Sequence, residues 1–164
     1  MQWDPSRAAL TYESLKYDFD HIVDNLYQGA APPFGDAVAK LGFDTLVLCA
    51  KENQREDLYP GIEIVLAPGD DDVRVERMMR DLPTWQQAAQ IVAERVASGK
   101  KVLVTCMAGL NRSGMVTALA LHQITGWSGK DIVEHIQASR DMALCNDTFA
   151  DYIRSQARAN DEEA

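Results

Sequence analysis

The stretch VLVTCMAGLNRSGMV, residues 102–116, decides the fold. An apolar run stops at Cys106, a short loop containing Gly109 follows, and helical spacing begins near Arg112. In open α/β sheets, binding sites lie beyond the carboxyl ends of the strands, where the next helix begins. We therefore expect Cys106 at the edge of a buried sheet, in a loop that leads directly into a helix.

The loop between Cys106 and Arg112 has the composition of an anion-binding site. Gly109 allows a tight turn, so that backbone N–H groups can point inward, and the following helix adds its positive end. The planar guanidinium of Arg112 can bind two phosphate oxygens at once. The same positive surroundings favour a thiolate on Cys106 at neutral pH. The pattern predicts a nucleophilic sulfur beneath a bound phosphate.

The rest of the chain alternates short apolar runs with amphipathic segments. This alternation predicts a single α/β domain over residues 1–164, with a core of about 19–158 and a mostly parallel central sheet flanked by helices. Strands are expected within residues 19–30, 44–50, 62–68 and 100–105. Helices are expected within 33–43, from Leu82 to Gly99, through 114–126, over 132–140 after a capping box of Ser128 and Asp131, and from near Asn146.

Composition limits the classes of protein and partner. The 164 residues suit one domain, and 46% hydrophobic and 25% charged residues are typical of a globular chain. No apolar run approaches the roughly 20 residues that span a membrane, and the opening MQWDPSRAAL lacks a secretion pattern, so a cytoplasmic location is expected. Three cysteines make no disulfide framework. The net charge of −9 disfavours nucleic acid and anionic membranes as partners. The tail ANDEEA is expected to fray.

Three segments carry a resemblance to a known family. CMAGLNRSG resembles the Cys-x5-Arg-Ser/Thr signature of the cysteine-dependent protein tyrosine phosphatase superfamily, and the whole layout resembles its dual-specificity phosphatase branch. IVDNLYQGAAPP is similar to the opening strand and turn of that branch, and RDMALCNDTFADYI to its closing segment. The signature lies too far from the N-terminus for the low-molecular-weight phosphatases or arsenate reductases. Rhodanese-like domains are a minor alternative.

The resemblance implies a role for each residue of the signature. Cys106 attacks phosphorus and forms a phosphocysteine, Arg112 holds the phosphate oxygens, and Ser113 donates a hydrogen bond to the sulfur as it leaves. Asn111 is expected to tolerate a left-handed backbone and to shape the loop. This chemistry requires no metal and no cofactor. The residues expected to bind the substrate phosphate, or a similar anion such as sulfate, are Met107, Ala108, Gly109, Leu110 and Asn111.

The family's reaction also needs a general acid that protonates the leaving oxygen. In similar enzymes an aspartate provides it from a loop after the preceding strand. Here that loop contains Asp70, Asp71 and Asp72, which lie 34 to 36 residues before Cys106. Counting from Pro68 favours Asp71, with its two neighbours as alternatives. Taken alone, the triplet would be interpreted as a solvated acidic loop.

One position departs from the family pattern. Family members usually have histidine immediately before the cysteine, where this chain has Thr105. Threonine can bond to the backbone but carries no charge. This departure favours the alternative of a phosphate-binding pseudophosphatase.

Cys49 ends a predicted strand parallel to the one that ends at Cys106. Both thiols would then lie at the same edge of the sheet. The position resembles that of superfamily members in which a second cysteine traps the oxidised nucleophile as a disulfide. The alternative is a packing residue, and Cys145 is a less favoured partner.

Two charged segments are expected to be solvated. KENQRED, residues 51–57, follows a strand and is interpreted as a surface loop, with a place at the rim of the pocket as the alternative. Arg74, Arg77 and Arg80 recur three residues apart on a predicted helix face, and solvation is favoured over a basic binding stripe.

A phosphorylated protein side chain is the favoured substrate. The residues between Cys106 and Arg112 are uncharged, whereas phosphoinositide phosphatases of the superfamily often place lysine there. The NRSG end of the loop is similar to that of some RNA 5′-phosphatases, which leaves RNA as an alternative. The choice between phosphotyrosine and phosphoserine or phosphothreonine depends on pocket depth, and the sequence predicts no oligomeric state.

Overall fold

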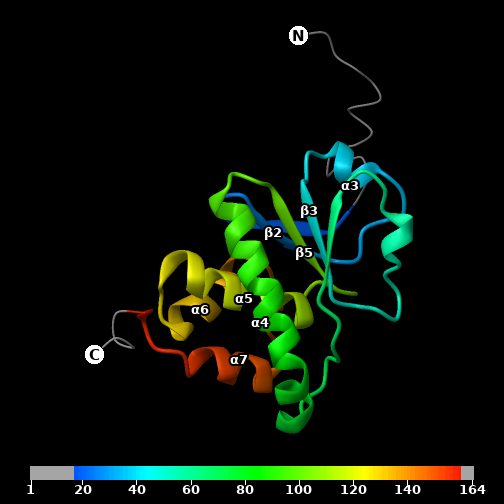
Figure 1. Ribbon diagram of the computed structural model, residues 1–164. Coiled ribbons are helices and arrows are strands. Elements are labelled where there is room, and N and C mark those ends of the chain that lie inside the picture. Colours follow the sequence, from blue (N-terminus) through cyan, green and yellow to red (C-terminus); the bar gives the residue numbers. More distant parts are fainter. Residues whose placement is uncertain (1–16, 160–164) are drawn as a thin grey trace.

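The computed structural model describes residues 17–159 (Figure 1). The expectations for the opening MQWDPSRAAL and for the tail after residue 159 lie outside these residues. The predicted fold class is confirmed, because the chain forms an α/β domain around one five-stranded sheet with the order β1-β2-β5-β3-β4. The strands are β1 Phe19–Val23, β2 Leu26–Gly29, β3 Thr45–Leu48, β4 Glu63–Leu66 and β5 Val102–Thr105.

The sheet is parallel except at one edge. Strand β1 pairs with β2 in an antiparallel hairpin, whereas β2, β5, β3 and β4 run parallel. The register places Leu48 of β3 opposite Thr105 of β5, so the carboxyl ends of these two strands meet at the same edge. Every residue of β3 and of β5 is buried, as expected for central strands covered on both faces.

Two layers cover the sheet (Figure 1). Helices α4, α5, α6 and α7 pack on one face, where Val47, Cys49, Val104 and Cys106 belong to the larger hydrophobic core. The short helix α3 and the 3-10 turn η1 lie over the other face, where Leu46 and Leu103 belong to the smaller core. The elements are α3 Ala37–Lys40, η1 Glu56–Leu58, α4 Val75–Ala97, α5 Arg112–Thr125, α6 Gly129–Ser139 and α7 Asp147–Arg154.

Two helix predictions need correction. Helix α4 begins at Val75, seven residues before the predicted Leu82, because its first two turns bury only Met78 and therefore show little apolar periodicity. Helix α3 is a single turn, and the exposed Phe34 lies outside it. The predicted cap of α6 is confirmed, since Ser128 Oγ accepts a hydrogen bond of 3.2 Å from the backbone N–H of Asp131. The extent of the domain beyond the described residues stays a prediction.

Candidate active site

The loop Cys106–Arg112, called the cysteine loop below, connects β5 to α5 as the sequence predicts. Cys106 directly follows the last residue of β5, and Arg112 is the first residue of α5. Gly109 has φ = +74°, and a Cβ atom there would overlap the carbonyl group of Gly29 at the end of β2. Only glycine fits this conformation and this close approach. The cysteine loop therefore packs directly against the end of strand β2.

Two buried side chains bind the carbonyl groups of the cysteine loop. Gln28 donates from Nε2 to the carbonyl oxygen of Gly109 (2.9 Å). Arg140 donates from Nε to the same oxygen (2.7 Å) and from Nη2 to the carbonyl oxygen of Ala108 (2.9 Å). Arg140 also pairs with Asp18 and Asp20, which raise its pKa against the effect of its burial. These contacts turn the loop carbonyls toward the protein.

The N–H groups of the loop are left for an external acceptor. Within residues 17–159, none of the backbone N–H groups of residues 107–111 donates a hydrogen bond to another protein group. The N-terminus of α5 adds further N–H groups at the same place. The arrangement can bind an anion with several oxygens through backbone donors.

The Cys106 side chain is 3% exposed and lies beside Ser113. A hydrogen bond joins Cys106 Sγ to Ser113 Oγ over 3.3 Å. Gln28 Nε2 also lies 3.4 Å from Ser113 Oγ, as a donor. Because the amide occupies the hydroxyl oxygen as an acceptor, the hydroxyl hydrogen is available to an ionised sulfur.

The guanidinium of Arg112 is buried beside a carboxylate. Arg112 Nη1 donates to Glu52 Oε1 (2.6 Å) and to the carbonyl oxygen of Gly69 (3.3 Å). Burial opposes the charge, but Glu52 and the nearby Cys106 outweigh it and raise the pKa of Arg112, so the cation is retained. Glu52 comes from the segment 51–57, which is exposed apart from Gln54, as a surface loop should be, and its contact with Arg112 agrees with the alternative of a place at the rim.

Thr105 belongs to a buried network of hydrogen bonds between uncharged groups. Its hydroxyl donates to the carbonyl oxygen of Val47 (2.7 Å) and accepts from Gln54 Nε2 (2.7 Å). Gln54 Oε1 in turn accepts from the backbone N–H of Ala50 (2.9 Å). Thr105 thereby ties β5 to β3 and to the loop that carries Glu52.

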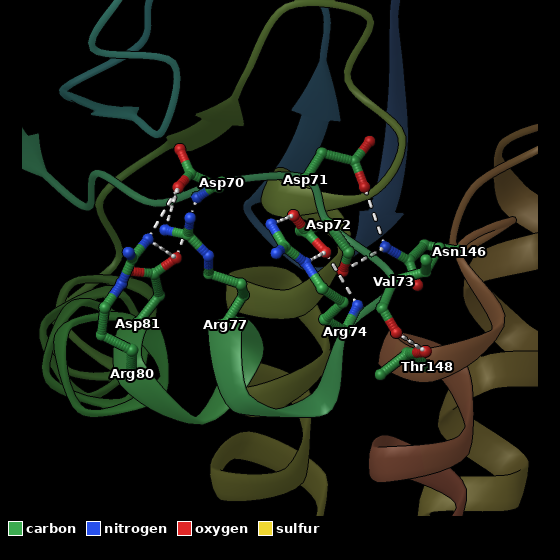
Figure 2. Close-up of polar contacts among 10 residues, drawn as sticks. All are labelled: Asp70, Asp71, Asp72, Val73, Arg74, Arg77, Arg80, Asp81, Asn146 and Thr148. Carbon is green, nitrogen blue, oxygen red and sulfur yellow. Dashed lines mark hydrogen bonds and ion pairs between the residues drawn. The ribbon is translucent and has the colours of Figure 1, made fainter.

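The segment Pro68–Arg74, called the aspartate loop, follows β4 and holds the three candidate acids (Figure 2). Asp70 pairs with Arg80 (2.6 Å), and this hydrogen bond lowers the pKa of Asp70. Asp72 pairs with Arg74 (2.7 Å), which holds the pKa of Asp72 far below its ordinary value. Both arginines are exposed, in agreement with the solvation predicted for these positions, and each also pairs with a carboxylate of this loop.

Asp71 differs from its two neighbours because amides bind it. Asn111 Nδ2 donates to Asp71 Oδ2 (2.9 Å), and Asn146 Nδ2 donates to Asp71 Oδ1 (2.9 Å; Figure 2 shows the second contact). Within residues 17–159, Asp71 forms no ion pair. The structure therefore joins Asp71 directly to the cysteine loop through Asn111.

The expectation for the Asn111 backbone is wrong. Asn111 has φ = −103°, and the left-handed residue of the loop is Gly109. Asn111 acts through its side chain, which is bound by the backbone N–H of Asn146 (2.8 Å) as well as binding Asp71.

Sequence reasoning missed four residues that bind these loops, and little in the pattern marked them. Gln28 and Gln54 are buried polar residues in or beside apolar runs, an unusual combination that is a usable signal. Asn146 was expected only as the start of a helix. Arg140 was noted only as part of the closing segment.

The second and third cysteines lie in different environments. Cys49 is fully buried, and its backbone N–H donates to the carbonyl oxygen of Thr105 (3.0 Å). Burial raises the pKa of the Cys49 thiol, and Cys106 adds to this effect. Cys145 is exposed, with its sulfur 3.5 Å from Asn111 Nδ2.

Comparison with known proteins agrees with this architecture. Human DUSP28 superposes with a TM-score of 0.72 at 20% identity, covering 89% of this chain and 95% of that one. Tk-PTP in its active form superposes with a TM-score of 0.66 at 24% identity, covering 84% and 96%. PTPMT1 in complex with PI(5)P superposes with a TM-score of 0.61 at 18% identity, covering 89% and 99%. These likenesses show the fold. No curated protein matches this chain in sequence.

Two further observations bear on class. None of the helices within residues 17–159 is long and apolar enough to cross a membrane. The family model described as dual specificity phosphatase, catalytic domain, matches residues 26–158 and so includes both loops. The chain therefore belongs to the dual specificity phosphatase family, within the cysteine-dependent phosphatase superfamily.

Proposed function

We propose that this protein hydrolyses phosphomonoesters on protein side chains, phosphotyrosine or phosphoserine and phosphothreonine, through a phosphocysteine intermediate. The observation that carries the proposal is the buried Cys106 sulfur at the base of a loop whose N–H groups have no acceptor within the described residues. Arg112 stands at the end of that loop with its charge retained. An anion with three equatorial oxygens matches this set of donors.

In the first step the Cys106 thiolate attacks phosphorus, and the bond from phosphorus to the ester oxygen breaks. Arg112 and the loop N–H groups hold the equatorial oxygens as charge spreads over them. Asp71 gives its proton to the leaving oxygen, which departs as the alcohol or phenol.

In the second step water attacks the phosphocysteine. The Asp71 carboxylate takes a proton from this water, phosphate forms, and the sulfur leaves as a thiolate. Ser113, 3.3 Å from the sulfur, donates its hydroxyl hydrogen to the developing negative charge. Met107, Ala108, Gly109, Leu110 and Asn111 contribute the backbone of the phosphate cradle.

Charge supports a protein substrate over a lipid or an RNA. The net charge is −9, and the loop residues 107–111 carry no cation that would meet additional phosphates. Three cysteines, an odd and sparse set, make no disulfide framework, which supports action in the reducing cytoplasm. Glu52 beside Arg112 adds a negative charge at the rim.

Thr105 favours a second candidate, a phosphate-binding pseudophosphatase. The usual histidine is absent, so no titratable group supports the cysteine from this position. The hydrogen bonds from Gln54 to Thr105 and from Thr105 to Val47 argue against the pseudophosphatase, because these uncharged groups hold the end of β5 in place without a histidine. We therefore favour the enzyme.

The test measures kcat/KM on 4-nitrophenyl phosphate, on phosphopeptides of each type, on a phosphatidylinositol monophosphate and on 5′-triphosphorylated RNA. We expect phosphopeptides to be hydrolysed best, with a phosphocysteine detected by mass after rapid quenching. Cys106→Ser should lower the rate at least about 1,000-fold while phosphate binding is retained, because a hydroxyl stays protonated. Arg112→Lys should cost about 100-fold or more, because an ammonium lacks the bidentate geometry.

Each alternative has its own outcome. Phosphate binding by the wild type without turnover of any substrate would establish the pseudophosphatase. Preference for the lipid or the RNA would keep the mechanism and replace the substrate class. Near-wild-type rates for Arg112→Lys would remove the assigned role of Arg112.

A further inference from the structure

Asn146 occupies the junction between helix α7 and the aspartate loop. Its side-chain oxygen caps α7 by accepting from the backbone N–H of Phe149 (3.3 Å). Its side-chain nitrogen donates outward, to Asp71 Oδ1 (2.9 Å) and to the carbonyl oxygen of Asp72 (3.1 Å). Asn146 is 6% exposed, whereas the Asp71 that it binds is exposed, so a buried amide holds a carboxyl that stays open to the solvent. One buried side chain thus serves both as a helix cap and as a ligand of the candidate acid.

Asn111 closes this network on the other side of the carboxylate. Its amide nitrogen binds Asp71 Oδ2, and its amide oxygen accepts from the backbone N–H of Asn146. Asp71 is therefore held at both oxygens by two side chains that are themselves connected. The two contacts come from residues 40 and 75 positions away in sequence, which makes the arrangement a product of the tertiary fold.

The chemical nature of the donors separates Asp71 from its neighbours. Arginine binds Asp70 and Asp72 and in each case lowers the pKa of the carboxyl, so these two groups hold a proton less readily than an isolated aspartate. An amide donor carries no charge, and it can hold a carboxyl in either protonation state through an oxygen lone pair. A group that must give a proton in one step and take one in the next needs this kind of ligand.

The aspartate loop is fastened to the same helix turn at a second point. Thr148 Oγ1 donates to the carbonyl oxygen of Val73 (2.6 Å; Figure 2). This contact involves the loop backbone and leaves Asp71 untouched. It therefore offers a matched control for any loosening of the loop against α7.

We propose that Asn146, with Asn111, is a positioning residue for the general acid, and that it aims the Asp71 carboxyl at the leaving oxygen. The inference rests on the proposed function, in which Asp71 is the acid. Asn146 acts through the Asp71 carboxyl that it binds, and it is not itself assigned a contact with the phosphate or the leaving oxygen. Its effect should therefore appear only where protonation of the leaving group limits the rate.

The experiment compares kcat/KM for phenyl phosphate, a poor leaving group, with kcat/KM for 4-nitrophenyl phosphate, a good one. Asn146→Ser keeps a strong helix-capping residue but removes the amide donor. We expect it to lower the phenyl phosphate value about tenfold, a fraction of the roughly 100- to 10,000-fold that a general acid supplies, and the 4-nitrophenyl value about twofold or less. Thr148→Val should leave the ratio of the two values unchanged. Asn146→Asp also keeps the cap, and it should change the ratio at least as much, because it places a second carboxylate beside Asp71.

A double-mutant cycle separates positioning from a general structural role. In the Asp71→Asn background, which lacks the acid, Asn146→Ser should change the ratio no further. An equal loss on both substrates, or an additive effect in the Asp71→Asn background, would overturn the inference. A change of the ratio in Thr148→Val as large as that in Asn146→Ser would also overturn the inference. If Asp71→Asn itself leaves the ratio unchanged, Asp71 is not the general acid, and the role proposed for Asn146 is wrong as well.

Discussion

The cysteine loop and the aspartate loop face the same site but are held by different forces. The cysteine loop is held by buried contacts. Gly109 packs closely against the backbone of Gly29, and buried side chains donate hydrogen bonds to the carbonyl groups of the loop. The acidic part of the aspartate loop lies at the surface and is held by polar contacts, with Arg80 bound to Asp70, Arg74 bound to Asp72, and Asn146 and Thr148 bound to the loop backbone. Gly69 of the aspartate loop is also closely packed, against Trp85, but the residues after it that include the candidate acids are mostly exposed and depend on polar partners.

The two kinds of support predict different tolerance to substitution. Steric fit against backbone cannot relax cheaply, because the neighbouring strand would have to move. Exposed ion pairs contribute little individually, so the loss of one should be absorbed by the others. A substitution that disturbs the packing of the cysteine loop should therefore have a much larger effect than one that removes a single ion pair of the aspartate loop.

Among substitutions outside the reacting side chains, the largest effect should come from Gly109→Ala. The added Cβ would overlap the carbonyl group of Gly29 at φ = +74°, so the loop or β2 must shift. A displacement of about 1 Å at a reacting group costs on the order of 100-fold, and we expect at least that loss of kcat/KM on 4-nitrophenyl phosphate.

Gly99→Ala is the matched control for this prediction. Gly99 has φ = +81° with nothing within 4 Å of a built Cβ, so only backbone strain is added. We expect about 1–2 kcal/mol of lost stability in thermal unfolding and unchanged activity. If Gly109→Ala behaved like Gly99→Ala, steric fit would not determine the cysteine loop.

The same contrast explains what the sequence could predict. Cys106, Gly109, Arg112 and Ser113 lie within eight consecutive residues between a strand and a helix, so local pattern was enough to place them. The fold class followed for a similar reason, because buried strands and their helices each occupy one short segment.

Local sequence pattern could not select the general acid among the three residues of the aspartate loop. The triplet is visible in the sequence, but its three members are chemically identical, and the partners of Asp71 lie 40 and 75 residues away along the chain. Asn111 and Asn146 distinguish Asp71 from its neighbours, and both come from other parts of the chain that only the tertiary fold brings to the loop. The late predicted start of α4 has a related cause, since its first turns carry the arginines that bind the loop instead of an apolar stripe.

The next prediction concerns oxidation of Cys106 and the buried Cys49 beside it. Cys49 and Cys106 each follow one residue after the register pair Leu48 and Thr105, and both belong to the same core cluster. Neighbouring parallel strands lie about 4.8 Å apart, within the Cα separation of up to about 7 Å that a disulfide allows. The raised pKa of the buried Cys49 thiol keeps it protonated, so an oxidant should attack Cys106 first.

We predict that peroxide converts Cys106 to a sulfenic acid, and that Cys49 then displaces water to form a disulfide. Activity of the wild type should return with a dithiol. Cys49→Ser should recover much less, because further oxidation of the sulfenic acid is irreversible, whereas Cys145→Ser should behave as the wild type. Equal recovery in Cys49→Ser, with no linkage to Cys106 seen by mass, would leave Cys49 as a packing residue.

The smallest effects should come from Asp70→Asn and Asp72→Asn, the matched partners of Asp71→Asn. Each of these two carboxyls has a pKa lowered by its arginine, so each stays ionised as the pH falls through the mildly acidic range and holds its ion pair there. An ionised, paired carboxylate has no proton to give. We therefore expect both variants to keep kcat/KM on phenyl phosphate within about threefold of the wild type, whereas Asp71→Asn should lose about 100-fold or more. The measurement is the ratio of phenyl to 4-nitrophenyl phosphate turnover in the three variants side by side. A shift of that ratio in Asp70→Asn or Asp72→Asn, with none in Asp71→Asn, would move the acid to the neighbour. It would also show that an arginine partner, and not an amide, marks the acid in this loop.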